Sequence, residues 1–243
     1  QALHDHTAGV VAADATVRAL ARRCSVEGVF LLEDTEVVRI DHRGDPIVVE
    51  TARGTLHAER LVITAGAWAA RFVPRLAERL CVRRQSVGYF DVDAPSAALA
   101  PGAFPVWIHT GTGPGDMHYG LPEFGGPGLK AARHDVVGPS QDPDARTGAD
   151  AAALASVQRF LAMHLDVEVR GVLRHESCLY TNTDDEDFIL GALPEDPRVV
   201  VGSACSGHGF KFAPLTGRLL AELALHGRTS VPAFEVARAR FSV

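Results

Sequence analysis

The spacing of apolar positions changes several times along the chain, and each change predicts an element. Residues 10–23 carry apolar side chains at helical spacing and end in Arg22-Arg23, which favours a helix C-terminus. The turn signal Arg53-Gly54 stands between two apolar runs and predicts a hairpin. Further short strands are predicted at residues 28–32, 36–40 and 47–50.

A continuous apolar run at residues 61–64 is typical of a strand buried on both faces of a sheet. It leads directly into Gly66 and an amphipathic segment that reaches about residue 80. Pro74 lies inside that segment, so we expect a break or kink there. This unit of strand, glycine and helix resembles part of a nucleotide-binding α/β domain.

The middle of the chain differs from both ends, because short alternating strands are separated by many Gly and Pro turns. This pattern predicts a mostly antiparallel second sheet. A polar loop, a helix, an extended segment, two strands and a final helix complete the expected order. The expected strands are 87–91, 105–109, 117–121, 128–133, 188–190 and 199–202, the extended segment is 168–180, the helices are 151–165 and 214–226, and the loop is 138–150.

The composition is that of an ordinary globular protein, with 47% hydrophobic and 22% charged residues, which excludes a disordered chain. With 24 basic and 30 acidic residues the net charge is −6, and no basic stripe is present, so we expect no nucleic-acid partner. No apolar stretch approaches the roughly 18 residues needed to cross a bilayer, so we expect no membrane association. The four cysteines are widely spaced, which suits a reducing compartment and predicts a cytoplasmic protein. They are Cys24, Cys81, Cys178 and Cys205.

Lysine is rare in this chain, and both lysines lie beside glycine-rich stretches. Of the 24 basic residues 22 are Arg, and Lys130 and Lys211 are the two lysines. Lysine offers a compact point charge that Arg cannot provide. Lys130 and His134 are four residues apart after Gly125-Gly126-Pro127-Gly128, which on a strand places both side chains on one face. Without further context, two exposed polar residues on an edge strand are the better interpretation.

The most specific stretch is residues 202–212, which lie between a buried strand and a helix. Its small residues allow a ligand to approach the backbone, and a helix N-terminus offers free N–H groups and a partial positive charge. Such a site suits a phosphate, a carboxylate or an anionic ring edge. The alternative is an ordinary tight turn, but His208 and Lys211 favour a binding site.

Other candidate groups are weaker. Cys178 lies where a strand leaves the second sheet, and a lone cysteine is usually a small buried hydrophobe. The acidic run 184–187 and the segment His4-Asp5-His6 contain metal-ligating residue types. A solvated turn and a polar tail are the better interpretations, so we expect no metal site. The G-x-S-x-G, H-E-x-x-H and P-loop motifs are absent, which excludes the common hydrolase signatures.

Six short motifs follow one another in order over nearly the whole chain. They are Thr64-Ala65-Gly66-Ala67-Trp68, Arg84-Gln85, Tyr119-Gly120-Leu121-Pro122, Gly125-Gly126 with Lys130 and His134, Cys178-Leu179-Tyr180-Thr181-Asn182-Thr183, and Ser206-Gly207-His208-Gly209-Phe210-Lys211. Each motif is weak alone, but the ordered combination is specific. Together they resemble the sarcosine oxidase family of flavin-dependent amine oxidases, whose relatives include N-methyltryptophan oxidase and pipecolate oxidase.

The resemblance implies FAD held covalently through a cysteine thioether on the flavin ring, and Cys178 occupies the position of that cysteine. It implies that Lys130 promotes the reaction of reduced flavin with oxygen and that Lys211 binds the substrate carboxylate. Tyr119 and His134 match positions that line the substrate pocket, and with Lys130 they are the expected catalytic residues. The other expected cofactor-binding residues are Gly66, Ala67, Trp68, Gly207, His208, Gly209, Phe210 and Lys211.

These implied roles agree with the chemistry of the residues. Reduced flavin and superoxide are both anionic, so an ammonium group such as that of Lys130 stabilises electron transfer to oxygen. A carboxylate substrate needs a fixed cation, and Lys211 is expected in the opening turn of a helix whose dipole adds to its charge.

The implied function is oxidation of the C–N bond of a secondary amino acid, sarcosine or another N-methyl amino acid, with O2 as acceptor, giving an imine and H2O2. The implied fold class is α/β (α+β), a partial FAD-binding Rossmann-like domain with an inserted, mostly antiparallel substrate-binding sheet. The FAD-binding domain would comprise residues 1–85 and 184–243, and the substrate-binding domain residues 86–183. No G-x-G-x-x-G loop precedes Gln1, so we expect the chain to correspond to the C-terminal two-thirds of such an enzyme.

Two alternatives stay open. One is a flavin dehydrogenase that passes electrons to a carrier instead of oxygen. The other is a non-catalytic remnant or subunit that binds a partner and no flavin, which the missing glycine-rich loop favours.

Overall fold

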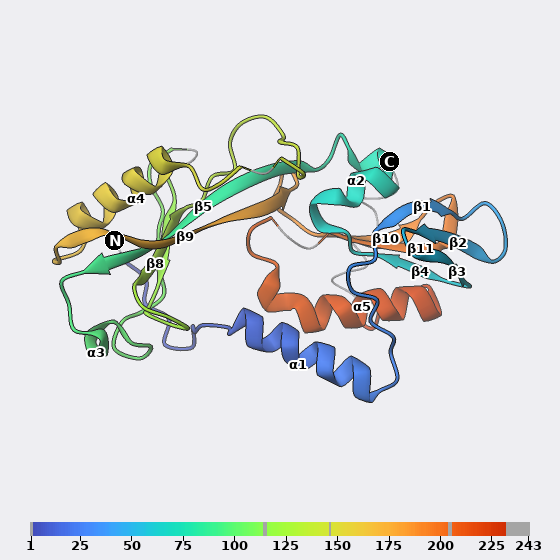
Figure 1. Ribbon diagram of the computed structural model, residues 1–243, viewed down its shortest axis with the longest axis horizontal. Coiled ribbons are helices and arrows are strands. Elements are labelled where there is room, and N and C mark those ends of the chain that lie inside the picture. Colours follow the sequence, from blue (N-terminus) through green and yellow to red (C-terminus); the bar gives the residue numbers. More distant parts are fainter. Residues whose placement is uncertain (1, 114–115, 146, 204–205, 232–243) are drawn as a thin grey trace. The chain divides into compact units, whose positions relative to one another are not determined.

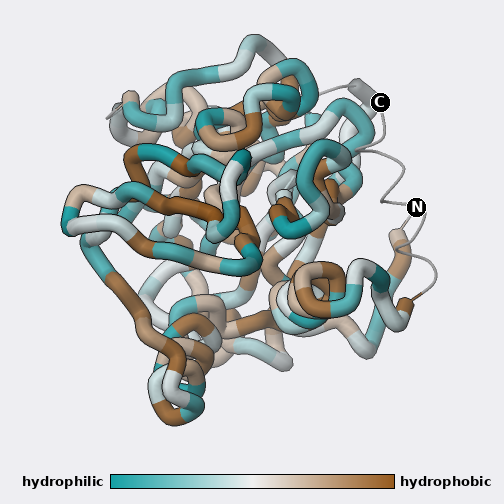
Figure 2. Tube along the Cα trace, turned by 90° about the vertical axis from the view of Figure 1, so that its right-hand side faces the viewer, coloured by the Kyte–Doolittle hydropathy of each residue, from teal (hydrophilic) through white to brown (hydrophobic). Residues whose placement is uncertain are grey.

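The computed structural model describes residues 2–113, 116–145, 147–203 and 206–231, so Cys205 lies outside the described residues. The chain divides into two compact units. Both contain helices and strands, which confirms the predicted mixed α/β class (Figure 1). Apolar stretches of the trace alternate with hydrophilic ones (Figure 2). Unit 1 comprises Gln1–Ala12 and Val82–Tyr180, and unit 2 comprises Ala13–Cys81 and Thr181–Val243.

Unit 1 is built on a five-stranded sheet with the strand order β6-β7-β8-β5-β9. The pairs β6–β7, β7–β8 and β5–β8 are all antiparallel, as the alternating strands and short turns predicted. The elements of this unit are β5 (Cys81–Val92), α3 (Ser96–Leu99), β6 (Trp107–His109), β7 (His118–Leu121), β8 (Leu129–Arg133), α4 (Ala151–His164) and β9 (Val169–Asn182). The first residue of β5 and the last two residues of β9 already belong to unit 2.

Helix α4 covers one face of this sheet. Leu129 and Ala131 of β8 pack in one buried cluster with Val157 and Leu161 of α4. The helix begins where it was predicted, because the Asp150 side chain accepts a hydrogen bond from the N–H of residue 152 at 2.8 Å and caps the first turn. Since side chains alternate along a strand, residues 130 and 132 of β8 point to the opposite face.

Beyond the β5–β8 ladder, a side chain continues the pairing of the two strands. The register runs from Phe90↔Leu129 to Val87↔Ala132. Gln85 is 1% exposed; its Nε2 donates to the carbonyl oxygen of Asp135 at 2.5 Å, and its Oε1 accepts from the N–H of Asp135 at 3.0 Å. The amide of Gln85 thus takes the place of a peptide group in the ladder. This contact fixes the backbone that follows β8.

Replacing Gln85 with Ala is expected to lower the free energy of unfolding by about 2–3 kcal/mol, because two partly buried backbone groups of Asp135 lose their partners. Gln141 offers a matched control: its Oε1 also accepts from a backbone N–H, that of Arg84 at 2.7 Å, but the residue is exposed. Water can replace that contact, so Gln141→Ala should change the free energy of unfolding by less than about 0.5 kcal/mol. Urea unfolding followed by circular dichroism measures both variants, and equal losses would contradict the role of Gln85.

Unit 2 holds two three-stranded sheets, with strand orders β1-β2-β3 and β10-β11-β4. The hairpin predicted at Arg53-Gly54 is confirmed, because β2 and β3 are antiparallel and Thr51 pairs with Gly54. In the second sheet β4 runs parallel to β11, and β10 runs antiparallel to it. The elements of this unit are α1 (Ala13–Val26), β1 (Val37–Asp41), β2 (Ile47–Thr51), β3 (Gly54–Ala58), β4 (Leu61–Ile63), α2 (Ala69–Phe72), β10 (Ile189–Leu193), β11 (Asp196–Ser203) and α5 (Ala213–His226).

Strand β11 is buried on both faces. Val199 and Val201 belong to one apolar cluster, while Val200 belongs to a second one with the apolar face of α5. Strand β4 stands at one end of the strand order, and its Val62 is 39% exposed. The double burial predicted for residues 61–64 is therefore wrong, because an apolar run does not show which strand of a sheet is central.

Two further predictions concern the segments on either side of the β1–β3 sheet. Residues 28–32 form no strand, and Phe30 is 92% exposed, so this apolar run has no pairing partner. After β4, a 3-10 turn (Gly66–Trp68) and α2 are followed by a second 3-10 turn (Pro74–Leu76). Because α2 ends at Phe72, the break predicted at Pro74 is confirmed.

Candidate functional site

Unit 1 gathers three of the predicted site residues on the sheet face that α4 does not cover. The Lys130 Nζ lies 5.6 Å from the ring centroid of Tyr89, which forms a buried cluster with Ala132 and the adjoining Tyr119. The hydroxyl of Tyr119 lies 3.5 Å from the hydroxyl of Tyr180. The ring of buried His134 lies beside that of Tyr180, with the two ring centroids 5.4 Å apart. The spacing of 130 and 134 therefore places both side chains on one face, as predicted.

Tyr89 is a residue of this face that sequence reasoning missed. Its ring packs against the Arg174 guanidinium, 3.8 Å from the ring centroid, and its hydroxyl donates to Glu176 Oε2 at 3.3 Å. Burial raises the pKa of Tyr89, and the charge of Glu176 adds to the effect. The available signal was the alternation of Val87 and Tyr89 along β5, which points both side chains to one face.

Cys178 lies on β9 and is an exposed free thiol. Desolvation by the surrounding atoms raises the pKa of Cys178, the nearby Glu176 raises it further, and Lys130 lowers it in part. The pKa of Tyr119 is also raised, chiefly by burial. Cys178 is thus close enough to Lys130 and Glu176 to respond to both charges, and it reaches solvent, unlike the small buried hydrophobe that a lone cysteine usually is.

In unit 2, the turn that follows β11 winds into α5. Ser206 and Gly207 adopt positive φ values of 43° and 72°, and a 3-10 turn (Phe210–Phe212) then leads into the helix. Lys211 lies in this 3-10 turn and not in the opening turn of α5, which corrects its expected position. Its Nζ donates to the carbonyl oxygen of His208 at 2.9 Å, so the exposed ammonium is held at the turn.

Two aromatic contacts hold the same turn in place. The ring of His208 stacks on Phe188 with centroids 5.3 Å apart, and its Nε2 lies 3.0 Å from the carbonyl oxygen of Glu186. Phe188 also contacts Phe212 edge-on at 5.6 Å. Of the two remaining predicted residues of this turn, Gly209 is buried and Phe210 is exposed.

The predicted cofactor residues Gly66, Ala67 and Trp68 form the 3-10 turn directly after β4, where Gly66 has a φ of 52°. Since β4 and β11 are parallel, the segments that follow these two strands leave the sheet at the same end, where both strands finish. Open α/β sheets bind ligands at this carboxyl end of their strands. The structure therefore brings together the two predicted cofactor-binding segments of unit 2.

Two buried polar side chains of unit 2 have unused hydrogen-bonding groups near this end of the sheet. Asn182 is 4% exposed and Ser203 is 3% exposed. In the described part of the chain, the amide oxygen and nitrogen of Asn182 and the hydroxyl of Ser203 have no hydrogen-bond partner. Buried polar groups are normally satisfied, so these atoms suit a polar ligand.

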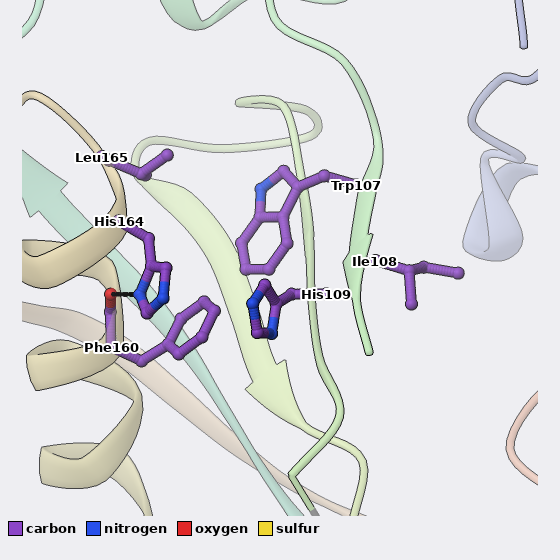
Figure 3. A pocket seen from close by; sticks show the side chains of 6 residues that line it. All are labelled: Trp107, Ile108, His109, Phe160, His164 and Leu165. Atoms are coloured by element: carbon purple, nitrogen blue, oxygen red, sulfur yellow. Dashed lines mark hydrogen bonds between the residues drawn. The ribbon is translucent and has the colours of Figure 1, made fainter. Parts of the chain in front are cut away.

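A separate cavity of about 210 Å³ lies on the α4 side of the unit 1 sheet. Gly120 makes room for the indole of Trp107, since a Cβ at residue 120 would lie 2.4 Å from the ring. Tyr119 points the other way, because neighbouring residues of a strand face opposite sides. The cavity therefore differs from the face that carries Lys130. The rings of His109, Phe160 and His164 line it, together with Trp107, Ile108 and Leu165 (Figure 3).

None of the helices in the described part of the chain has both the length and the hydrophobicity of a membrane span. No group of three or more His, Cys, Asp or Glu side chains in the same residues is arranged to hold a metal ion.

Comparison with known proteins identifies the family. The family model described as FAD dependent oxidoreductase (DAO) matches residues 1–223. Monomeric sarcosine oxidase of Bacillus sp. (strain NS-129) is 31% identical over 237 residues, covering 94% of this chain and 59% of the relative. N-methyl-L-tryptophan oxidase of Salmonella agona (strain SL483) is 31% identical over 242 residues, covering 99% and 62%. The open form of NikD, an unusual amino acid oxidase essential for nikkomycin biosynthesis, matches with a TM-score of 0.77 at 25% identity, covering 93% and 59%.

The fold and these matches are those of a family of FAD-dependent flavoproteins. The chain belongs to the FAD dependent oxidoreductase (DAO) family. It spans 59% and 62% of the length of the two relatives named above. The unused polar atoms of Asn182 and Ser203, beside turns rich in small residues, fit a cofactor such as FAD.

Proposed function

We propose that the protein oxidises the C–N bond of a secondary amino acid, sarcosine or another N-methyl amino acid, with FAD as cofactor and O2 as acceptor, giving an imine and H2O2. The observation that carries the proposal is the sheet face on which Lys130, Tyr119, His134 and Cys178 come together, in a chain of the FAD dependent oxidoreductase family. FAD, when bound, accepts the hydride from the carbon next to the nitrogen.

The proposed substrate class rests on the names of two relatives. One is a sarcosine oxidase and the other an N-methyl-L-tryptophan oxidase. Sarcosine is N-methylglycine, so the two named amino acids share a secondary amine and a carboxylate and differ in the side chain. Lys211 supplies a cation for that carboxylate, since its ammonium is exposed and no carboxylate within the described residues forms an ion pair with it.

The residues of unit 1 have separate proposed roles. Lys130 places a positive charge where O2 acquires negative charge on accepting electrons, and a fixed charge of this kind lowers the barrier. Tyr119 and His134 line the substrate pocket, where the tyrosine hydroxyl and the imidazole can hydrogen-bond a polar substrate group. Cys178 provides the thiol for a thioether to the flavin ring.

The proposal extends to the organisation of the whole chain. Residues 1–85 and 184–243 would form the FAD-binding part and residues 86–183 the substrate-binding part. A reducing, cytoplasmic setting is proposed as well, because Cys24 and Cys178 are free thiols.

The proposed function is tested by peroxide formation. Protein expressed from its complete natural sequence is incubated in air with sarcosine, N-methyl-L-tryptophan, glycine or dimethylamine, and H2O2 is measured with a coupled peroxidase. We expect an N-methyl amino acid to react at least about tenfold faster than glycine or dimethylamine, because each control lacks one of the two groups that the site recognises.

The alternatives give different results in the same experiment. A dehydrogenase would reduce an artificial electron acceptor with these substrates but release no peroxide. A non-catalytic remnant would bind no FAD. Either result would refute the oxidase activity.

A further inference from the structure

Asn182 is a buried amide that lacks the partners its chemistry requires. It is the last residue of β9, is 4% exposed, and has no hydrogen-bond partner for either Oδ1 or Nδ2 in the described structure. A side-chain amide has one acceptor oxygen and two donor hydrogens, and burying it unpaired is unfavourable. The residue therefore points to a ligand that both donates and accepts hydrogen bonds.

The backbone on both sides of Asn182 is tied to the predicted cofactor turn. The N–H of Ser206 donates to the carbonyl oxygen of Thr181 at 3.0 Å. The hydroxyl of Ser206 accepts from the N–H of Thr183 at 3.4 Å. Ser206 therefore binds the residues on each side of Asn182, and it also opens the turn that continues through Gly207 to Lys211.

Ser203 is a second, independent sign of a polar ligand beside the same turn. It is the last residue of β11, three positions before Ser206, and its hydroxyl is also buried with no partner among the described residues. Asn182 and Ser203, two buried side chains with unpaired polar groups, thus lie close to this turn along the chain or through Ser206. The residues beside Asn182 differ from it. Thr181 and Thr183 are also buried, but Ser206 bonds a backbone group of each, and the hydroxyl of Thr183 donates to the carbonyl oxygen of Asp187 at 2.7 Å.

We propose that the amide of Asn182 hydrogen-bonds FAD, offering its oxygen and nitrogen to the polar edge of the flavin ring. That edge carries carbonyl oxygens and an N–H group, which match the acceptor and donor of a side-chain amide. This inference rests on the proposed use of FAD and adds a cofactor-binding residue outside the glycine-rich turn. Asn182 is a binding residue in this proposal and takes no part in the chemical step.

The test measures, for each variant, both the stability of the FAD-free protein and its affinity for FAD. Asn182→Leu is made in a Cys178→Ala background, so that FAD binds reversibly, and the complete natural chain is used. We expect FAD titrations followed by flavin fluorescence to show binding weakened about tenfold or more, the loss expected from one or two hydrogen bonds. The unfolding midpoint of the FAD-free protein should rise, because the variant removes an unpaired buried amide.

Thr216→Val is the matched control in the same unit. Thr216 is also a buried polar residue, but its hydroxyl already donates within α5, 3.2 Å from the carbonyl oxygen of Phe212 and 3.1 Å from that of Ala213. The control should leave the affinity for FAD unchanged and should not raise the unfolding midpoint. If Asn182→Leu fails to fold, Asn182→Ala gives the same contrast in affinity.

Three outcomes would overturn the inference. Unchanged affinity with a raised midpoint would show that the amide is unpaired in the protein but does not contact FAD. A lowered midpoint with unchanged affinity would show a purely structural role. Absence of FAD binding by the Cys178→Ala parent and by the unmodified chain would refute the proposed function itself, which separates that failure from the other two.

Discussion

Replacing Lys130 with Met is expected to slow the reaction of the reduced protein with oxygen by about 100- to 1,000-fold, the loss typical of removing one fixed electrostatic contact from a reacting charge. Methionine keeps the length and apolar stem of lysine, so the packing over the Tyr89 ring is largely preserved while the charge is lost. Oxidation of the amine should change little, because the proposed role of Lys130 concerns only electron transfer to oxygen.

Stopped-flow spectroscopy separates the two half-reactions. The protein is reduced with substrate in the absence of air and then mixed with oxygenated buffer, and flavin absorbance reports each step. Lys211→Met is the matched control, since Lys211 is the other lysine of the sequence. That variant should impair reduction by substrate and spare the oxygen step. An oxygen reaction of normal rate in Lys130→Met would refute the role of Lys130.

Replacing Cys178 with Ala is expected to abolish flavin that stays with the protein after acid precipitation. A thioether survives denaturation, whereas FAD held by noncovalent contacts leaves the unfolded chain. Of the three cysteines that the structure describes, Cys178 is the exposed one, and it lies on the face that carries Lys130.

Visible absorption of the dissolved precipitate measures the retained flavin. Cys24→Ala and Cys81→Ala are the controls, because both thiols are only partly exposed and both belong to unit 2. They should retain flavin at the level of the unmodified protein. Retention of flavin by Cys178→Ala would exclude Cys178 as the attachment residue.

The sequence predicted most elements because their signals were local. The break at Pro74 follows from the chemistry of a single residue, and the start of α4 follows from the capping side chain of Asp150. The wrong predictions concerned which segments pair with one another in space. Residues 28–32 have strand-like composition but no pairing partner, and residues 61–64 form an edge strand in place of a central one. Composition does not encode either fact.

The candidate site was predictable where spacing alone places a side chain. The four-residue interval between Lys130 and His134 is enough to put them on one face of a strand. The contacts of Tyr89 with Arg174 and Glu176, and the contact of Gln85 with the backbone of Asp135, depend on pairing between distant segments. Sequence spacing contains no information on that register, so these residues required the structure.

The placement of the aromatic residues makes each unit separately observable. The sequence contains two tryptophans, and Trp107 lies in unit 1 beside α4 while Trp68 lies in unit 2 in the turn after β4. Replacing either one with Phe leaves a single tryptophan in a known half of the molecule. Emission from that tryptophan, excited at a wavelength that tyrosine does not absorb, then follows the unfolding of one unit at a time, without any attached label.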